Sequence, residues 1–185
     1  MNRNDGTLTN PTFVAGTIDN AIQFSSYNPV IINNPVGYPS KAISLTSWVK
    51  ADATISTDFV VTRNNPESSY LCVRTGGRNP DFDLYIDGAW RFCSSPSSID
   101  TNWHHIVGTY DSEGDRILRT YVDGTLKTTR DISTLGLSNY DVVSTLTTTR
   151  IGAAYDGRYA QGLIEDFRVY NRALSSGEIY RCIGS

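Results

Sequence analysis

The sequence predicts an all-β fold, an antiparallel two-sheet β-sandwich that ends in one short helix. Short alternating runs rich in Val, Ile, Thr, Tyr and Phe recur about every 8 to 12 residues between clusters of Gly, Pro, Asn and Asp, which is the pattern of sandwiches and barrels. Helical periodicity is almost absent before the C-terminal segment. No linker or internal repeat divides the chain, so we expect one domain over residues 1–185.

Twelve segments have the composition of strands, being rich in β-branched and aromatic residues and bounded by turn formers. The stretches 63–69, 76–81 and 94–99 contain Pro and predict loops that shape a binding rim, and 131–145 is a longer polar loop. The expected strands are 20–24, 29–33, 42–51, 57–63, 69–75, 81–86, 89–94, 103–110, 116–122, 125–130, 146–152 and 161–170.

Two Asp-Gly pairs each lie between two expected strands, Asp87-Gly88 and Asp123-Gly124. A two-residue type I′ turn needs positive φ at both central positions, which Asp and Gly adopt readily. We therefore interpret both aspartates as turn formers in β-hairpins and not as functional acids.

One helix is predicted, after the last strand. Ser175 is placed as its N-cap, and Glu178 lies three residues later as the partner in a capping box. Leu174 and Ile179 have the spacing of a hydrophobic staple. The sequence therefore predicts a short C-terminal helix that folds back on the sandwich.

The composition excludes several classes of function. A net charge of -3 and a pI near 5.3 lack the basic surface that nucleic-acid binding requires. Mean hydropathy is -0.30, and no apolar run approaches the ~18 residues of a membrane span. Arg outnumbers Lys by 13 to 3. Because Arg makes planar, bidentate contacts with carboxylates and sulfates, this ratio hints at an acidic ligand, although Arg is also the usual structural partner of Asp.

Cys72, Cys93 and Cys182 match no zinc motif in their spacing. They are read as buried free thiols, with a Cys72–Cys93 disulfide as the alternative. His104 and His105 point to opposite faces of one strand and cannot readily chelate one metal together, so packing beside Trp103 is the preferred interpretation.

Four segments carry a resemblance to a known family. They are 42–50 (AISLTSWVK), 103–124 with WHHIVGTYD and YVDG, 150–152 (RIG) and 162–175 (GLIEDFRVYNRALS). In order and spacing, over roughly residues 13 to 180, they resemble the laminin G-like, concanavalin A-like lectin/glucanase jelly-roll superfamily, and more distantly the pentraxins. The resemblance implies a jelly-roll sandwich. Members usually carry a strand before the 4–10 stretch at which this chain begins, and Ser25 and Asn28 stand where many have carboxylates.

A sugar site is expected to pair aromatic rings, which stack on the apolar faces of sugars, with polar side chains that bind hydroxyls. Trp90 is the leading candidate because it follows a hairpin turn in a polar, Arg-rich neighbourhood. The full set of candidates is Tyr85, Trp90, Arg63, Arg74, Arg91, Tyr155 and Tyr159.

The resemblance further implies a structural calcium near the junction of the first and last strands, with Asp19 and either Glu165 or Asp166 as ligands. Alternation along the last strand sends Glu165 and Asp166 to opposite faces, so only one of them can face a given site. The alternative is that Asp166 forms a same-face ion pair with Arg168.

No catalytic motif is present. The only Glu-x-Asp, Glu113-Gly114-Asp115, lies in an expected turn, and no nucleophile elbow appears. We therefore expect a non-catalytic, lectin-like, carbohydrate-binding module of a secreted protein, which works outside the cell or at its surface. Its partners would be a glycan or polysaccharide and other domains of the same polypeptide. The competing prediction is a protein-interaction or structural module of a cell-surface, tail-fibre or capsid-associated protein.

Overall fold

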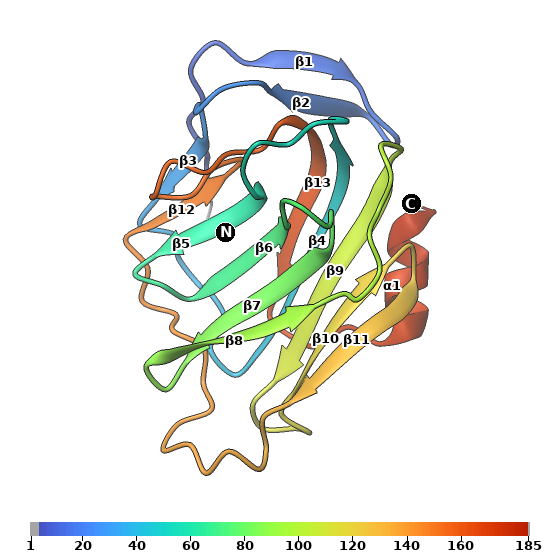
Figure 1. Ribbon diagram of the computed structural model, residues 1–185. Coiled ribbons are helices and arrows are strands. Elements are labelled where there is room, and N and C mark those ends of the chain that lie inside the picture. Colours follow the sequence, from blue (N-terminus) through green and yellow to red (C-terminus); the bar gives the residue numbers. More distant parts are fainter. Residues whose placement is uncertain (1–3, 185) are drawn as a thin grey trace.

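The computed structural model describes residues 4–184, which form two antiparallel sheets packed face to face (Figure 1). The seven-stranded sheet has the order β1-β2-β13-β4-β9-β10-β11, and the six-stranded sheet has the order β3-β12-β5-β6-β7-β8. Strands that are neighbours within a sheet are often distant in sequence, as in β13 between β2 and β4. The predicted antiparallel jelly-roll sandwich with one short C-terminal helix is confirmed.

The elements are β1 (Thr12–Ala15), β2 (Asn20–Phe24), β3 (Val30–Asn33), β4 (Ala42–Ala51), β5 (Phe59–Asn65), β6 (Ser69–Val73), β7 (Pro80–Ile86), β8 (Ala89–Ser94), β9 (His104–Asp111), β10 (Ile117–Val122), β11 (Thr125–Asp131), β12 (Thr148–Ile151), β13 (Gly162–Tyr170) and α1 (Ser176–Ile183). Each of the twelve expected strands is present within a few residues of its predicted bounds. Strand β1 was not predicted.

The two predicted hairpins have the expected backbone. Asp87 and Gly88 have φ of 51° and 75°, and Asp123 and Gly124 have φ of 50° and 75°. These values are the positive φ pairs of type I′ turns. The first hairpin joins β7 to β8 and the second joins β10 to β11.

The core lies between the sheets and consists of the inward-facing residues of both. Phe59, Phe82 and Leu84 come from the six-stranded sheet, and Ile106 and Leu118 face them from the seven-stranded sheet; all five are fully buried. The sheets approach closely at Gly108 in β9, where a Cβ atom would lie 2.1 Å from the ring of Phe82. A larger residue there would push the sheets apart.

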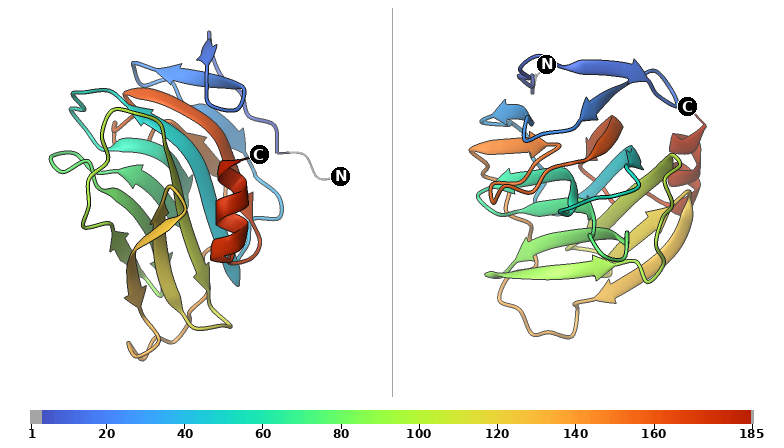
Figure 2. Two further views of the ribbon diagram at one scale, coloured as in Figure 1. Left: turned by 90° about the vertical axis from the view of Figure 1, so that its right-hand side faces the viewer. Right: turned by 45° about the horizontal axis from the view of Figure 1, so that its top comes forward.

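Helix α1 packs on the outer face of the seven-stranded sheet (Figure 2). Ser175 and Glu178 form the predicted capping box, in which each side chain accepts a backbone N–H of the other residue. Leu174 and Ile179 are buried with Val107 of β9 and Tyr121 of β10. The helix therefore covers part of one outer face, whereas no helix of the described chain covers the outer face of the six-stranded sheet.

Candidate functional site

The outer face of the six-stranded sheet concentrates the aromatic and charged side chains. The antiparallel register places one residue from each of five adjacent strands in a row across this face. From β12 to β8 the row consists of Arg150, Arg63, Tyr70, Asp83 and Phe92.

Guanidinium groups lie over the aromatic rings of this face. The Cζ atom of Arg63 is 4.3 Å from the ring centroid of Trp90 and 4.8 Å from that of Tyr70. The Cζ atom of Arg74 is 5.7 Å from the centroid of Phe92. These distances are within the ~6 Å at which a cation is attracted to the face of a ring. Tyr70 is only 1% exposed because the guanidinium groups cover it, whereas Phe92 is 48% exposed.

Glu67 fixes the orientation of the central pair. Its Oε1 atom accepts a hydrogen bond from Nη2 of Arg63, and its Oε2 atom accepts one from Nε1 of Trp90, both at 3.0 Å. The ring of Tyr85 meets that of Trp90 edge-on, with centroids 5.5 Å apart. One exposed carboxylate thus holds a guanidinium and an indole ring side by side.

Buried aspartates anchor the second arginine of the face. Arg74 donates to Asp58 and Asp83 at 3.1 and 2.6 Å and also to Asp81. Asp81 and Asp83 are fully buried and lie two residues apart on β7, so they share a face. Burial and the adjacent Asp81 raise the pKa of Asp83 to about 9. The raised pKa favours the neutral form of Asp83, which reduces the cost of burying two neighbouring carboxyl groups.

Arg158 completes the network from the loop before β13. Its Nη1 atom donates to Asp58 at 2.7 Å and to the hydroxyl of Tyr70 at 3.1 Å, and its Nη2 atom donates to Asp156 at 2.6 Å. The loop is thereby fastened to the outer face of the sheet.

Two cavities open on this face, one on each side of Arg63. The first, of about 150 Å³, is lined by Arg63, Tyr70, Arg74, Asp83, Trp90, Phe92 and Arg158. The second, of about 270 Å³, is lined by Arg63, Asn64, Asn65, Glu67, Tyr155 and Asp156. Together they offer ring faces, N–H donors and carboxylate acceptors within one surface, which we call the arginine–aromatic face.

The structure brings five of the seven expected ligand residues to this face. Arg63, Arg74, Tyr85 and Trp90 contact one another there directly or through Tyr70. Tyr155 borders the larger cavity, and its ring lies 3.9 Å from the Cζ atom of Arg150.

The other two expected residues lie elsewhere. Arg91 is opposite Leu84 of the core, so it points to the other side of β8 from Trp90, and it donates to the carbonyl of Ile86. Tyr159 bonds to Thr57 and to Gln161. The placement of Arg91 follows from the two-residue period of the strand, since neighbours cannot share a face.

Sequence reasoning did not identify the acids of the network. Asp81 and Asp83 are separated by one residue on an expected strand, and that spacing was a usable signal for a carboxyl pair on one face. Asp58 and Arg158 are 100 residues apart and carry no such signal.

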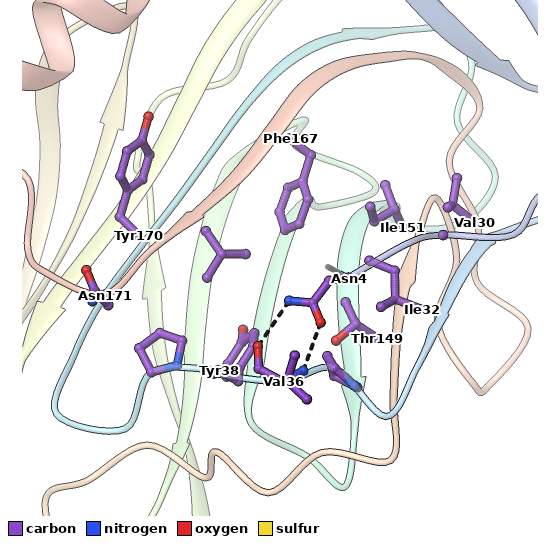
Figure 3. Close-up of a pocket in the computed structure, with 15 residues that line it drawn as sticks. Asn4, Val30, Ile32, Val36, Tyr38, Thr149, Ile151, Phe167, Tyr170 and Asn171 are labelled. Atoms are coloured by element: carbon purple, nitrogen blue, oxygen red, sulfur yellow. Dashed lines mark hydrogen bonds between the residues drawn. The ribbon is translucent and has the colours of Figure 1, made fainter. Parts of the chain in front are cut away.

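A larger but chemically different groove lies between the sheets, at the edge formed by β3 and β12 (Figure 3). It has a volume of about 620 Å³, and none of its described lining residues is charged. Ile32, Ile151 and Phe167 supply apolar surface, and the amide of Asn4 exchanges two hydrogen bonds with the backbone of Val36 at 2.8 and 3.1 Å. The described lining has polar side chains, among them Asn4, Tyr38 and Asn171, but no charged group to orient a sugar.

Two of the three expected calcium ligands, Glu165 and Asp166, have carboxylates engaged in other contacts. Both carboxylate oxygens of Glu165 accept backbone N–H groups, from Thr17, Ile18 and Asp19 at 2.6, 2.9 and 2.5 Å. Asp166 forms an ion pair with Arg168 at 2.7 Å, as the alternative predicted. Within residues 4–184, no three His, Cys, Asp or Glu side chains are grouped to hold a metal ion. As placed, these residues do not fit a calcium shell, and calcium remains a prediction to be tested by chelation.

Strict alternation along β13 proved wrong at this point. The pairing with β4 shifts register between Glu165 and Arg168, and Asp166 has a φ of 51°. This bulge lets both Ile164 and Phe167 contact the core, although simple alternation would place them on opposite faces.

The cysteines and histidines have structural surroundings. Cys72, Cys93 and Cys182 are free thiols; Cys93 belongs to the core between the sheets, and Cys72 packs with Tyr70 on the outer side. His105 packs on Trp48, with ring centroids 5.3 Å apart, and not on Trp103 as expected.

Comparison with known proteins agrees with this architecture. The model of the concanavalin A-like lectin/glucanases superfamily (Laminin_G_3) matches residues 24–180. No curated protein matches the sequence. Within the described residues, no helix is long and apolar enough to cross a membrane.

Several solved structures are similar in fold. Domain 4 of AbnA, a GH43 extracellular arabinanase from Geobacillus stearothermophilus solved with arabinotriose, has a TM-score of 0.73 and 15% identity, over 95% of this chain and 86% of that one. The ligand-binding domain of botulinum neurotoxin serotype D, solved with N-acetylneuraminic acid, has a TM-score of 0.70 and 18% identity, over 98% of this chain and 46% of that one. This chain thus spans less than half of the toxin domain.

Proposed function

This chain belongs to the concanavalin A-like lectin/glucanase superfamily, and on that premise we propose that it is a non-catalytic carbohydrate-binding module whose site is the arginine–aromatic face. The module would attach a larger extracellular protein to a glycan. The arabinanase domain and the toxin domain, whose solved structures contain arabinotriose and N-acetylneuraminic acid, support a sugar as the ligand class.

One observation carries the proposal. Trp90 and the half-exposed Phe92 lie beside Arg63 and Arg74, on a face that α1 leaves uncovered. Aromatic rings supply apolar stacking surface for a sugar, and the fixed guanidinium groups supply hydrogen-bond donors for its oxygens. Such a combination of a few oriented polar groups with aromatic surface is typical of ligand sites.

The same geometry argues against catalysis on this face. A glycosidase needs two carboxyl groups that reach the scissile bond from accessible positions. Of the acids on this face, Asp81 and Asp83 have fully buried side chains held by Arg74, whereas the exposed Glu67 and Asp156 pair with Arg63 and Arg158. The Glu113-Gly114-Asp115 triplet lies in the turn between β9 and β10, where Asp115 pairs with Arg119. These acids have structural contacts that account for them.

A glycan array followed by calorimetry tests the proposal. We expect the native protein to bind at least one glycan and Trp90→Ala to weaken that binding at least about tenfold, because a central Trp contributes about 2 kcal/mol or more at a binding site. Tyr180→Ala is the matched control, since Tyr180 is 73% exposed on α1 and remote from the proposed site. Absence of glycan binding, or equal affinity of the Trp90 variant, would reject the proposal.

The second candidate function, a protein-interaction or structural module, is favoured by the apolar groove at the β3–β12 edge. Val36 and Val169 line it and are 47% and 38% exposed. Exposed apolar surface marks protein-interaction sites as well as ligand-binding grooves. If no glycan on the array binds, the groove becomes the candidate binding surface.

A further inference from the structure

The smaller cavity of the arginine–aromatic face has an unusual set of charges, and an inference about its ligand rests on the proposed function. Three of its seven lining residues are arginines, Arg63, Arg74 and Arg158, and only one lining residue, Asp83, is an acid. Asp83 is fully buried, and burial raises its pKa, which favours its neutral form. A ligand in this cavity would therefore meet three guanidinium groups and no accessible carboxylate among the lining residues. Other acids that pair with these guanidinium groups, among them Asp58, Asp156 and Glu67, lie outside the lining.

The arginines of the cavity differ in how many of their N–H donors are already paired within the protein. A guanidinium group carries five N–H donors. The protein contacts of Arg74 use three of its groups, Nε, Nη1 and Nη2, each for one aspartate. Among the described residues, 4–184, the side chain of Arg63 donates only from Nη2, to Glu67. Arg63 thus has most of its donors available while its plane is held by the rings of Tyr70 and Trp90.

A second cation adds to the positive charge at this end of the sheet. Arg150 is directly opposite Arg63 in the pairing of β12 with β5. Like charges at such positions repel, and they are destabilising unless an anion lies between or beside them. Among residues 4–184, Arg150 forms no ion pair, and its one side-chain hydrogen bond goes to the hydroxyl of Tyr27. Glu67, which pairs with Arg63, is the one carboxylate in that range that lies within ion-pair distance of either arginine.

We propose that this cavity binds the anionic group of an acidic sugar residue, a carboxylate or a sulfate ester, while the sugar ring stacks on Trp90 or Phe92. The cavity volume of about 150 Å³ suits a single charged substituent with part of its ring. The planar fork of Arg63 matches the two oxygens that a carboxylate or sulfate presents, which a neutral hydroxyl cannot reproduce.

Ion pairs with buried or half-buried aspartates account for Arg74 and Arg158 but not for Arg63. Arg74 and Arg158 neutralise buried or half-buried aspartates, and their removal would disturb the fold. Arg63 contacts no buried acid, and its partner Glu67 is 47% exposed. Arg63 is therefore the residue whose substitution tests ligand binding without removing the anchor of Asp81 and Asp83.

The experiment compares matched pairs of acidic and neutral sugars by calorimetry. The first pair is trigalacturonic acid and its methyl ester, in which each carboxyl group loses its charge and gains a methyl group. The second pair is lactose 6′-sulfate and lactose. We expect the acidic member of one pair to bind at least about tenfold more tightly, and Arg63→Gln to abolish that preference; the preference should also weaken with added salt.

Arg119→Gln is the control variant. Arg119 lies in the other sheet and pairs with Asp115 four residues away, as Arg63 pairs with Glu67, so it removes an equivalent ion pair far from the cavity. Retention of the acid preference in Arg119→Gln, with unchanged thermal unfolding of both variants, supports the proposal.

Three results overturn the inference, and they differ in what they imply for the function. Equal binding of acidic and neutral sugars, or Trp90-dependent binding of neutral glycans alone, rejects the acidic ligand and leaves the carbohydrate-binding function standing. Absence of binding to these sugars and to every glycan of the array rejects both. An acid preference that persists in Arg63→Gln rejects the assignment to this cavity.

Discussion

Two adjacent histidines have pKa shifts of opposite direction because they lie on opposite sides of one strand. His104 lies between Asp123 and Asp100, with its ring nitrogens 2.8 and 2.9 Å from their carboxylates. These hydrogen bonds, first that to Asp123, raise the pKa of His104. His105 is 1% exposed on the other side, and burial lowers its pKa to about 4.

The two histidines should titrate in different pH ranges, observable from their imidazole proton signals by NMR. His105 should titrate near pH 4, and His104 should titrate above its ordinary value of about 6.5. The signs for stability are opposite. His104 contributes fully below about pH 6.5 and loses its contribution as the pH rises through its raised pKa. His105 contributes above about pH 6.5 and loses its contribution as the pH falls towards 4. One shared midpoint near 6.5 would contradict this assignment.

Single residues also show what the sequence could and could not predict at the site. Trp90 and Arg63 were predictable because a hairpin turn and a local excess of Arg marked their neighbourhood. Arg91 was expected beside Trp90, but adjacent residues of a strand face opposite ways. The contact between Asp58 and Arg158 depends on how a loop returns to the sheet, which no local pattern encodes.

At the scale of elements, Glu165 joins the turn between β1 and β2 to the last strand. Its carboxylate accepts three successive backbone N–H groups, which would otherwise be unpaired donors. Gly16 permits this approach, since a Cβ atom there would lie 2.5 Å from the carboxylate carbon. These contacts engage one of the carboxylates that the family resemblance implied as a calcium ligand.

Glu165→Gln should lower the melting temperature. Loss of a charged acceptor for three partly buried N–H groups costs about 2 kcal/mol, which corresponds to roughly 4 to 8 °C for a chain of this size. Glu113→Gln is the control, because Glu113 is 71% exposed and should leave the temperature unchanged. EDTA should leave the native melting temperature unchanged as well. A clear fall with EDTA, restored by calcium, would contradict this account and support the calcium prediction.

The elements themselves were predicted unevenly, for physical reasons. Except for β3 and β11, the twelve expected strands bury residues of at least one face, which imposes the alternation that the sequence displays. Strand β1 does not; Phe13, its largest residue, is 59% exposed, so it carries no inward pattern. The bulge at Asp166 was also unpredictable, because one extra residue in a strand leaves the composition unchanged.

At the scale of the whole molecule, the two sheets have different surroundings. The seven-stranded sheet carries α1 on its outer face, where Leu174 and Ile179 are buried. The six-stranded sheet carries the network of Arg74, Arg158 and the buried aspartates, which holds its outer surface in place without covering it. The outer face of the six-stranded sheet is thus uncovered, and its polar side chains are already oriented. A ligand that binds there loses little free energy to the ordering of side chains.

The central claim is that this face, and not the apolar groove, binds the sugar, and NMR mapping tests it most directly. Titration with a glycan from the array should shift the backbone amide signals of Arg63 and Phe92 and the indole N–H signal of Trp90, because these groups border the two cavities. Signals from Val36 and Phe167, which line the groove, should stay unchanged. The opposite result, with shifts at the groove and none around Trp90, would contradict the account.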